Sequence, residues 1–138
     1  FTNSQLIEKG YSLPLLSPHE AGYQLAGIAQ KYDFCLYEYF ITDLVGHTQN
    51  MEIACKEVFK IDELVGAVLE KLDLEITTVC IISDHGNIED LSTKSHTANP
   101  VPFMVWGPLS KYFLDNVFNI ADLATVTQKI MPELGKNQ

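Results

Sequence analysis

The stretch TTVCIISDHGN, residues 77–87, decides the fold class because a short apolar run in it ends abruptly in polar residues. The aromatic and branched run DFCLYEYFITD at 33–43 predicts a strand buried on both faces, as in a parallel sheet, and residues 77–84 predict a second strand. Asp84 ends this strand, and His85 and Gly86 follow it. A buried strand that carries a carboxylate and an imidazole to its end predicts a ligand site at that edge of the sheet.

Helical and strand patterns alternate on both sides of this stretch. We predict helices at 17–32, 50–72 and 119–134, strands at 33–43, 77–84 and 101–107, and a polar loop at 85–99. Ser17, Pro18 and Glu20 give the first helix an N-cap, a first-turn proline and a capping box. The alternation predicts an α/β fold, with a mostly parallel sheet and helices on both of its faces.

Apolar residues recur at spacings of three and four in the three helices, so we expect each helix to bury one side. The predicted inward positions are Ala21, Leu25, Ile28 and Tyr32, then Ala54, Val58, Ile61, Val65, Val68 and Leu72, and finally Leu123, Val126 and Ile130 after an Asn119 cap. Residues 1–16 are predicted to be a leading segment or the tail of a missing part, and residues 17–138 a portion of one domain.

The composition is that of a soluble globular protein, with 138 residues, 46% of them hydrophobic. A net charge of −9 argues against nucleic-acid and anionic-membrane partners. No apolar run approaches the roughly 20 residues of a membrane span, and we expect a cytoplasmic setting. Cys35, Cys55 and Cys80 have no paired-thiolate spacing, so we interpret them as reduced core residues.

Oxygen and nitrogen donors gather at the predicted strand boundaries. Asp43 ends the strand at 33–43 and His47 follows it, Asp84 and His85 follow the next strand, and His96 precedes the third. Because the carboxyl ends of parallel strands meet at one edge of a sheet, we expect these side chains to converge.

Glycines stand beside the donors in both of the first two motifs. Gly46 and Gly86 are expected to let the backbone bend, so that the flanking side chains reach one point.

A bound divalent metal is the simplest explanation for two aspartates at such a site. Burying uncompensated carboxylates costs several kcal/mol each, and neither motif contains a basic residue. Carboxylate and imidazole donors without a thiolate suit Mn²⁺ or Zn²⁺. The alternative for each motif is structural: an aspartate can cap a helix, and a histidine can satisfy a backbone group.

Three motifs in this order, DLVGHT, SDHGNIE and HTANPVPFMVWG, resemble the metal-binding half of the alkaline phosphatase superfamily. Within it, the cofactor-independent phosphoglycerate mutases are most similar, from about Tyr32 to the closing helix. The resemblance implies two divalent metal ions and phosphoryl transfer. It implies that Asp43, His47 and His96 hold one ion, and that Asp84 and His85 hold the other.

The resemblance also implies roles for polar neighbours of the ligands. Asn87 and Glu89 would orient the ligands, while Thr97 and Asn99 would shape the loop that carries His96. Because His96 precedes its strand, we expect the strand at 101–107 to start at the metal edge and run antiparallel to the others.

Two expected features of the family have no match in this sequence. The family's Ser or Thr nucleophile and a further metal-binding Asp lie in an amino-terminal segment, and the mutases carry an inserted basic substrate domain. We therefore expect the chain to be the carboxyl-terminal portion of a longer enzyme. Alone it should be inactive and expose apolar surface where the missing amino-terminal part packs.

A phosphoglycerate mutase-like enzyme acting on a small phosphorylated metabolite is the first functional hypothesis. A phosphatase or other phosphoester hydrolase of the same superfamily is the second, because the segments that select the substrate are not recognisable. A non-catalytic metal-binding domain and a purely structural α/β domain remain as alternatives.

Overall fold

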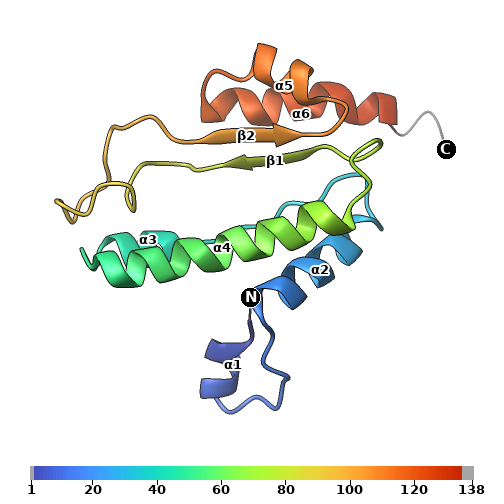
Figure 1. Ribbon diagram of the computed structural model, residues 1–138. Coiled ribbons are helices and arrows are strands. Elements are labelled where there is room, and N and C mark those ends of the chain that lie inside the picture. The colour runs from blue at the N-terminus through green and yellow to red at the C-terminus, as the bar shows by residue number, and fades with distance from the viewer. Residues whose placement is uncertain (1, 135–138) are drawn as a thin grey trace. The chain divides into compact units, whose positions relative to one another are not determined.

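The computed structural model describes residues 2–134, and its helices and strands follow one another as labelled in Figure 1. In chain order they are α1 (Ser4–Glu8), α2 (Pro18–Ala29), α3 (Ile41–Gly46), α4 (Met51–Lys71), β1 (Val79–Ile82), β2 (Phe103–Trp106), α5 (Ser110–Asn116) and α6 (Ile120–Leu134). The short helices α1, α3 and α5 were not predicted from the sequence. No helix in this part of the chain is long and apolar enough to cross a membrane.

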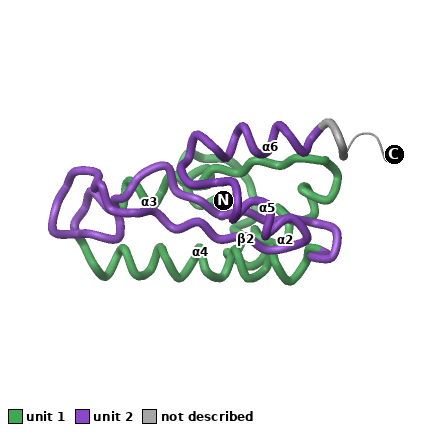
Figure 2. The backbone as a smooth tube through the Cα atoms, turned by 90° about the horizontal axis from the view of Figure 1, so that it is seen from above, with its two compact units in different colours: residues 1–45, 50–72 green, residues 46–49, 73–138 purple. Residues whose placement is uncertain are grey.

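The chain divides into two units, which Figure 2 colours separately. Unit 1 holds the residues up to 45 together with 50–72, and therefore contains α2 and α4. Unit 2 holds residues 46–49 and the chain from 73 onward, with both strands, α5 and α6.

Helix α2 of unit 1 begins as its sequence predicted. The Ser17 hydroxyl accepts a hydrogen bond from the Glu20 N–H at 3.1 Å, and the Glu20 carboxylate accepts one from the Ser17 N–H at 2.7 Å. The bond from the Ser17 N–H to the Glu20 carboxylate lowers the pKa of Glu20, since it favours the ionised form. The buried side is Ala21, Gly22 and Ala26, whereas Ile28 and Tyr32 are exposed. The predicted stripe was thus wrong at its carboxyl end, because small residues form the face of α2 that packs against α4.

Helix α4 is the long helix expected at 50–72. The Asn50 side chain caps it by accepting from the Ile53 N–H at 3.1 Å. Ala54 and Leu72 are buried as predicted, but Val58 is half exposed. Leu64, Ala67 and Glu57 are buried although the pattern did not select them.

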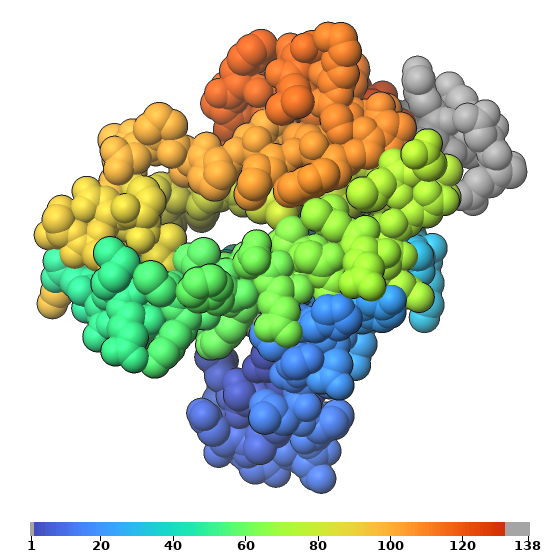
Figure 3. Space-filling view, in the orientation of Figure 1, coloured from blue at the N-terminus to red at the C-terminus, as the bar shows by residue number. Residues whose placement is uncertain are grey.

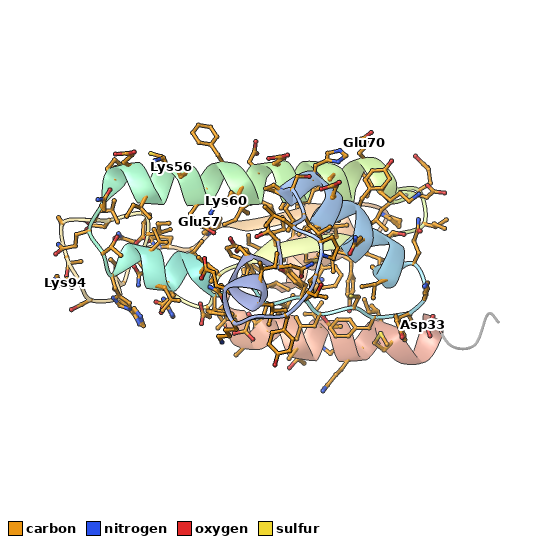
Figure 4. The ribbon with its side chains drawn as sticks, turned by 90° about the horizontal axis from the view of Figure 1, so that it is seen from below. Asp33, Lys56, Glu57, Lys60, Glu70 and Lys94 are labelled. Atoms are coloured by element: carbon orange, nitrogen blue, oxygen red, sulfur yellow. The ribbon has the colours of Figure 1, made fainter. Side chains whose placement is uncertain are left out.

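The buried Glu57 carboxylate has two partners inside unit 1. The Tyr39 hydroxyl donates to one carboxylate oxygen, and the Lys60 ammonium lies 2.7 Å from the other. Figure 4 shows that Glu57 and Lys60 both come from α4. Glu57 is only 5% exposed, which is rare for a carboxylate unless it is paired, so these contacts explain its burial.

Replacing Tyr39 by phenylalanine should lower the free energy of unfolding by about 1–3 kcal/mol, because a buried carboxylate loses one of its hydrogen bonds. Urea unfolding followed by circular dichroism measures this loss. Tyr32→Phe is the matched control, since Tyr32 is 66% exposed, and it should change little.

The same contact predicts a pH dependence of stability. Burial, and then the bond to Glu57, raises the pKa of Tyr39 above its usual value. The stabilisation is therefore fully present below the unfolded pKa of about 10 and is lost as the pH rises toward the folded value. The stability gap between the wild type and Tyr39→Phe should narrow above about pH 10, and a gap that stays constant from pH 8 to 11 would contradict the assignment.

The strand predicted at 33–43 does not form. Residues 41–46 are helical, and residues 34–40 have no assigned strand or helix. A strand is stabilised by ladder hydrogen bonds, and between residues 2 and 134 the only strands are β1 and β2, which pair with each other. Asp43 consequently lies in the first turn of α3 and not at a strand end.

The sheet of unit 2 is antiparallel. β1 pairs with β2 from Val79 opposite Trp106 to Ile82 opposite Phe103. The antiparallel direction expected for the strand at 101–107 is confirmed. A mostly parallel sheet with helices on both faces is not found among the described residues, because the expected first strand does not form.

The core of unit 2 lies where α5 and α6 pack beside the two strands (Figure 1). Phe113, Val117 and Val126 are its buried centre, and Leu123 and Ile130 pack against them as predicted. The Asn119 side chain accepts from the Ala121 N–H at 3.0 Å, which confirms it as the cap of α6.

All three cysteines are free, in agreement with the sequence prediction. Cys35 and Cys55 are nevertheless exposed, so the expectation that they are core residues was wrong. Cys80 lies on β1 against the unit 2 core, and burial raises its pKa to about 11, which keeps the thiol protonated at neutral pH.

Candidate metal centre

The loop between β1 and β2 carries most of the predicted ligands. Because the two strands are antiparallel, the end of β1 and the start of β2 lie at the same edge, so the loop leaves and returns there. Asp84 and His85 stand just after β1, and His96 stands before β2. A bridge between Gly86 and Thr97, with the Thr97 N–H 2.9 Å from the Gly86 carbonyl, holds its two arms together. Figure 3 shows the loop, in yellow, away from α5 and α6.

Three imidazole rings stack in unit 2. The His85 and His96 ring centroids are 3.7 Å apart with planes 13° from parallel, and the His47 and His96 centroids are 5.2 Å apart. One ring nitrogen of His85 lies within 4.8 Å of one of His96. His96 is thus the central ring, with His47 on one side and His85 on the other.

The backbone carbonyl of Lys94 fixes the tautomer of His47. His47 Nδ1 lies 2.6 Å from that oxygen, which can only accept, so Nδ1 carries the proton. Nε2 then has the lone pair, in agreement with its 3.5 Å approach to the Asn87 Nδ2 donor. A second partner on the far nitrogen is how metal-binding histidines are usually oriented.

Asp84 lies beside the histidine stack. Its Oδ2 is 3.5 Å from His85 Nε2, and its side chain is 73% exposed. The expectation of a deeply buried carboxylate that demands compensation therefore does not hold for Asp84. The exposed carboxylate is instead accessible to a ligand that approaches the loop from solvent.

The predicted orienting residues form one hydrogen-bonded group around Glu89. Its carboxylate accepts from the Thr97 hydroxyl, from Asn99 Nδ2 at 3.1 Å and from the Asn87 N–H at 2.5 Å. These bonds, led by the one from Thr97, lower the pKa of Glu89. A lowered pKa keeps the carboxylate ionised as the pH falls, so the bonds persist in mildly acidic solution and are lost only as the pH falls through the folded pKa.

Gly46 and Gly86 both allow neighbouring side chains to approach the backbone closely. Neither has a positive φ. A Cβ on Gly46 would lie 1.5 Å from Asn87 Oδ1, and one on Gly86 would lie 2.1 Å from Thr97 Oγ1. Both glycines leave room for side chains of the loop.

Unit 2 brings together four of the five predicted ligands: His47, His85, His96 and Asp84. Asp43 belongs to unit 1, where it is half buried in α3. The donors of unit 2 are imidazole nitrogens and a carboxylate oxygen, and the Cys80 thiol belongs to the hydrophobic core. This set fits a divalent ion such as Mn²⁺ or Zn²⁺.

A cavity of about 430 Å³ opens beside these donors within unit 2. It is lined by residues 83–86, 97–101 and 118–120, so Asp84 and His85 form part of its wall. Its volume is that of a small-molecule site, and its position next to the donors allows a ligand to contact a bound ion.

Sequence reasoning missed two groups that support the loop. The Lys94 carbonyl orients His47, and Gln49 Nε2 donates to the Leu91 carbonyl at 3.1 Å. Every residue has a backbone carbonyl, so the sequence could not single out that of Lys94. Gln49 has a φ of 54°, and nothing in its residue type predicted that conformation.

Comparison with known proteins gives one family. Curated relatives named 2,3-bisphosphoglycerate-independent phosphoglycerate mutase are 35% identical over 108 residues in Clostridium botulinum, 34% over 100 in Desulforudis audaxviator and 32% over 109 in Ehrlichia ruminantium. These matches cover 73%, 68% and 74% of this chain. The chain spans about a fifth of each relative, with 21%, 20% and 22% covered. No solved structure matches it.

These relatives confirm the resemblance drawn from the three motifs. A family model described as Metalloenzyme superfamily matches residues 21–138, which include every predicted ligand. Divalent metal binding is a property of this family, and the stacked histidines of unit 2 lie inside the matched region. The chain belongs to the Metalloenzyme superfamily.

Proposed function

We propose that this chain is the metal-binding part of a phosphoryl-transfer enzyme that acts on a small phosphorylated metabolite, as a phosphoglycerate mutase does. The observation that carries the proposal is the stack of His47, His96 and His85 beside the Asp84 carboxylate. Three imidazoles side by side can give nitrogen ligands to metal ions, and imidazole is the commonest metal ligand in proteins.

In the proposed site, two divalent cations, Mn²⁺ or Zn²⁺, are held by two sets of ligands. Asp43, His47 and His96 form one set, and Asp84 and His85 form the other. When bound, such ions neutralise a phosphoryl group and stabilise the attacking and leaving oxygens. His47 is oriented for this task by the Lys94 carbonyl, which leaves Nε2 as the coordinating atom.

Local charge supports a need for these ions. The loop at 84–99 contains Asp84, Glu89 and Asp90 but only one basic residue, Lys94, and the whole chain carries a net charge of −9. A phosphorylated substrate would be repelled by such a surface without added positive charge. The cavity beside Asp84 and His85 has room for a small metabolite.

The nucleophilic Ser or Thr and a further metal ligand are proposed to lie in another part of the same polypeptide, with residues 17–138 as one portion of the enzyme domain. The relatives are between three and four times as long as this chain, which supports this. So does the apolar segment at 32–40, in which Leu36 is 81% exposed and Phe40 54%. The chain alone should then be inactive.

Metal analysis tests the site directly. The purified chain, dialysed against Mn²⁺ or Zn²⁺, should retain metal that His47→Ala and Asp84→Asn each reduce, with unchanged circular dichroism. Equal metal content in all three proteins would reject the ligand assignment.

Enzyme assays on the product of the complete reading frame test the reaction. Conversion of 3-phosphoglycerate to 2-phosphoglycerate would support a mutase, and hydrolysis of p-nitrophenyl phosphate alone would support a phosphatase. Metal binding without either activity would identify a non-catalytic metal-binding domain.

A further inference from the structure

Besides the bridge between Gly86 and Thr97, one carboxylate joins the two arms of the loop between β1 and β2. Glu89 Oε1 accepts from the Thr97 hydroxyl and from Asn99 Nδ2, both on the arm that carries His96. Glu89 Oε2 accepts from the Asn87 N–H, on the arm that carries His85. One side chain thus connects the segments that bear the two closest rings of the histidine stack.

The backbone at Gly86 lies close to this exposed carboxylate. A Cβ on Gly86 would lie 2.1 Å from Thr97 Oγ1 and 2.6 Å from Glu89 Oε1, so the backbone approaches both groups as closely as a glycine allows. The Thr97 N–H also donates to the Gly86 carbonyl at 2.9 Å. Glu89, Thr97 and Gly86 are therefore in mutual contact.

Asn87 extends the connection to the third histidine. It is 7% exposed, its Oδ1 packs against Gly46, and its Nδ2 lies 3.5 Å from His47 Nε2. Because Glu89 holds the Asn87 backbone, the position of Asn87 beside His47 depends on the same carboxylate.

We propose that Glu89 is a positioning residue that clamps the two arms of the loop and holds the histidine rings together before any metal binds. The effect of Glu89 on metal binding rests on the proposed function. The hydrogen bonds that form the clamp are present without a metal. Its effect is entropic, because a loop whose arms are already joined loses less freedom when its histidines close on an ion.

A set of four variants tests the clamp. Glu89→Ala removes the carboxylate, Thr97→Val removes its hydroxyl donor, and Thr97→Ser restores that donor. Asp90→Ala is the matched control, since Asp90 is the adjacent acidic residue and its carboxylate accepts hydrogen bonds from the N–H and hydroxyl of nearby Ser92.

Mn²⁺ affinity should respond to the clamp and not to loss of charge. Removal of a group that orients ligands typically weakens metal binding about 10–100-fold. We expect this loss for Glu89→Ala and for Thr97→Val. The double variant should lose no more than Glu89→Ala alone, because the bond that Thr97→Val removes is already absent in Glu89→Ala. Thr97→Ser and Asp90→Ala should bind within about threefold of the wild type. Wild-type affinity in Glu89→Ala, or fully additive losses in the double variant, would overturn the proposal.

Hydrogen exchange of the metal-free chain separates this proposal from the proposed function. The Thr97 amide should exchange faster in Glu89→Ala and Thr97→Val than in the wild type and Asp90→Ala, because its bond to the Gly86 carbonyl opens more often. Absence of metal binding by the wild type would reject the proposed function alone. Unchanged Thr97 exchange in Glu89→Ala would reject the clamp.

Discussion

Replacing His96 by alanine should weaken Mn²⁺ binding more than about 100-fold, which is beyond the loss expected for removing a group that merely orients a ligand. His96 is the central ring of the stack, 3.7 Å from the His85 centroid and 5.2 Å from that of His47. Its removal takes away a proposed ligand and leaves the other two rings without the neighbour between them. Isothermal titration of the purified variant with Mn²⁺ measures the change.

The matched control for this prediction is His19→Ala. His19 is exposed, like His96, but it lies on α2 of unit 1, where its Nε2 is 3.4 Å from a Glu70 carboxylate oxygen. Its loss should leave Mn²⁺ affinity unchanged. Because His96 is exposed, its replacement should preserve the fold. Equal Mn²⁺ affinities in His96→Ala and His19→Ala would contradict the assignment of His96 as a metal ligand.

Replacing Gly107 by alanine should lower the free energy of unfolding of unit 2 by roughly 2–5 kcal/mol. Gly107 follows β2 with a φ of 101°, in a region where an L side chain costs about 1–2 kcal/mol. A Cβ there would also lie 2.1 Å from the Thr77 carbonyl oxygen and 2.9 Å from the Thr78 Cα. These are backbone atoms leading into β1, so relief would require a shift of the strand and adds an overpacking cost of about 1–3 kcal/mol.

Gly10→Ala separates the two causes of that loss. Gly10 has a φ of 90°, but no atom lies within 4 Å of where its Cβ would be. It should therefore incur only the conformational cost. Urea unfolding of both variants measures the two changes in the free energy of unfolding. Equal changes would contradict the prediction, because they would show that contact with Thr77 adds no destabilisation to Gly107→Ala.

The sequence predicted the β1–β2 side of the site well. The apolar run before Asp84 forms β1, and the position of His96 before its strand correctly indicated that β2 runs antiparallel. These inferences held because they depend on local hydrophobicity and on which end of a strand carries a polar residue. The capping box at Ser17 and the Asn119 cap were predictable for the same reason, since a cap bonds to a backbone group only a few residues away.

The prediction failed for the segment at 33–43, whose aromatic residues indicated a buried strand. Strand formation depends on a partner as well as on residue type, and within residues 2–134 no strand pairs with this segment. The hydrogen bond between Glu89 and Thr97 could not be predicted from the sequence either. It joins residues eight positions apart through a loop that has no periodic pattern.

One measurement tests the metal centre most directly: a titration of the metal-free chain with Mn²⁺, followed through the imidazole NMR signals of its four histidines. Mn²⁺ is paramagnetic and broadens signals of nearby nuclei. We predict that His47, His85 and His96 broaden together at substoichiometric Mn²⁺ while His19 stays sharp. If the signals of the three proposed ligands stay sharp, or all four histidines broaden equally, the loop between β1 and β2 is not a metal centre.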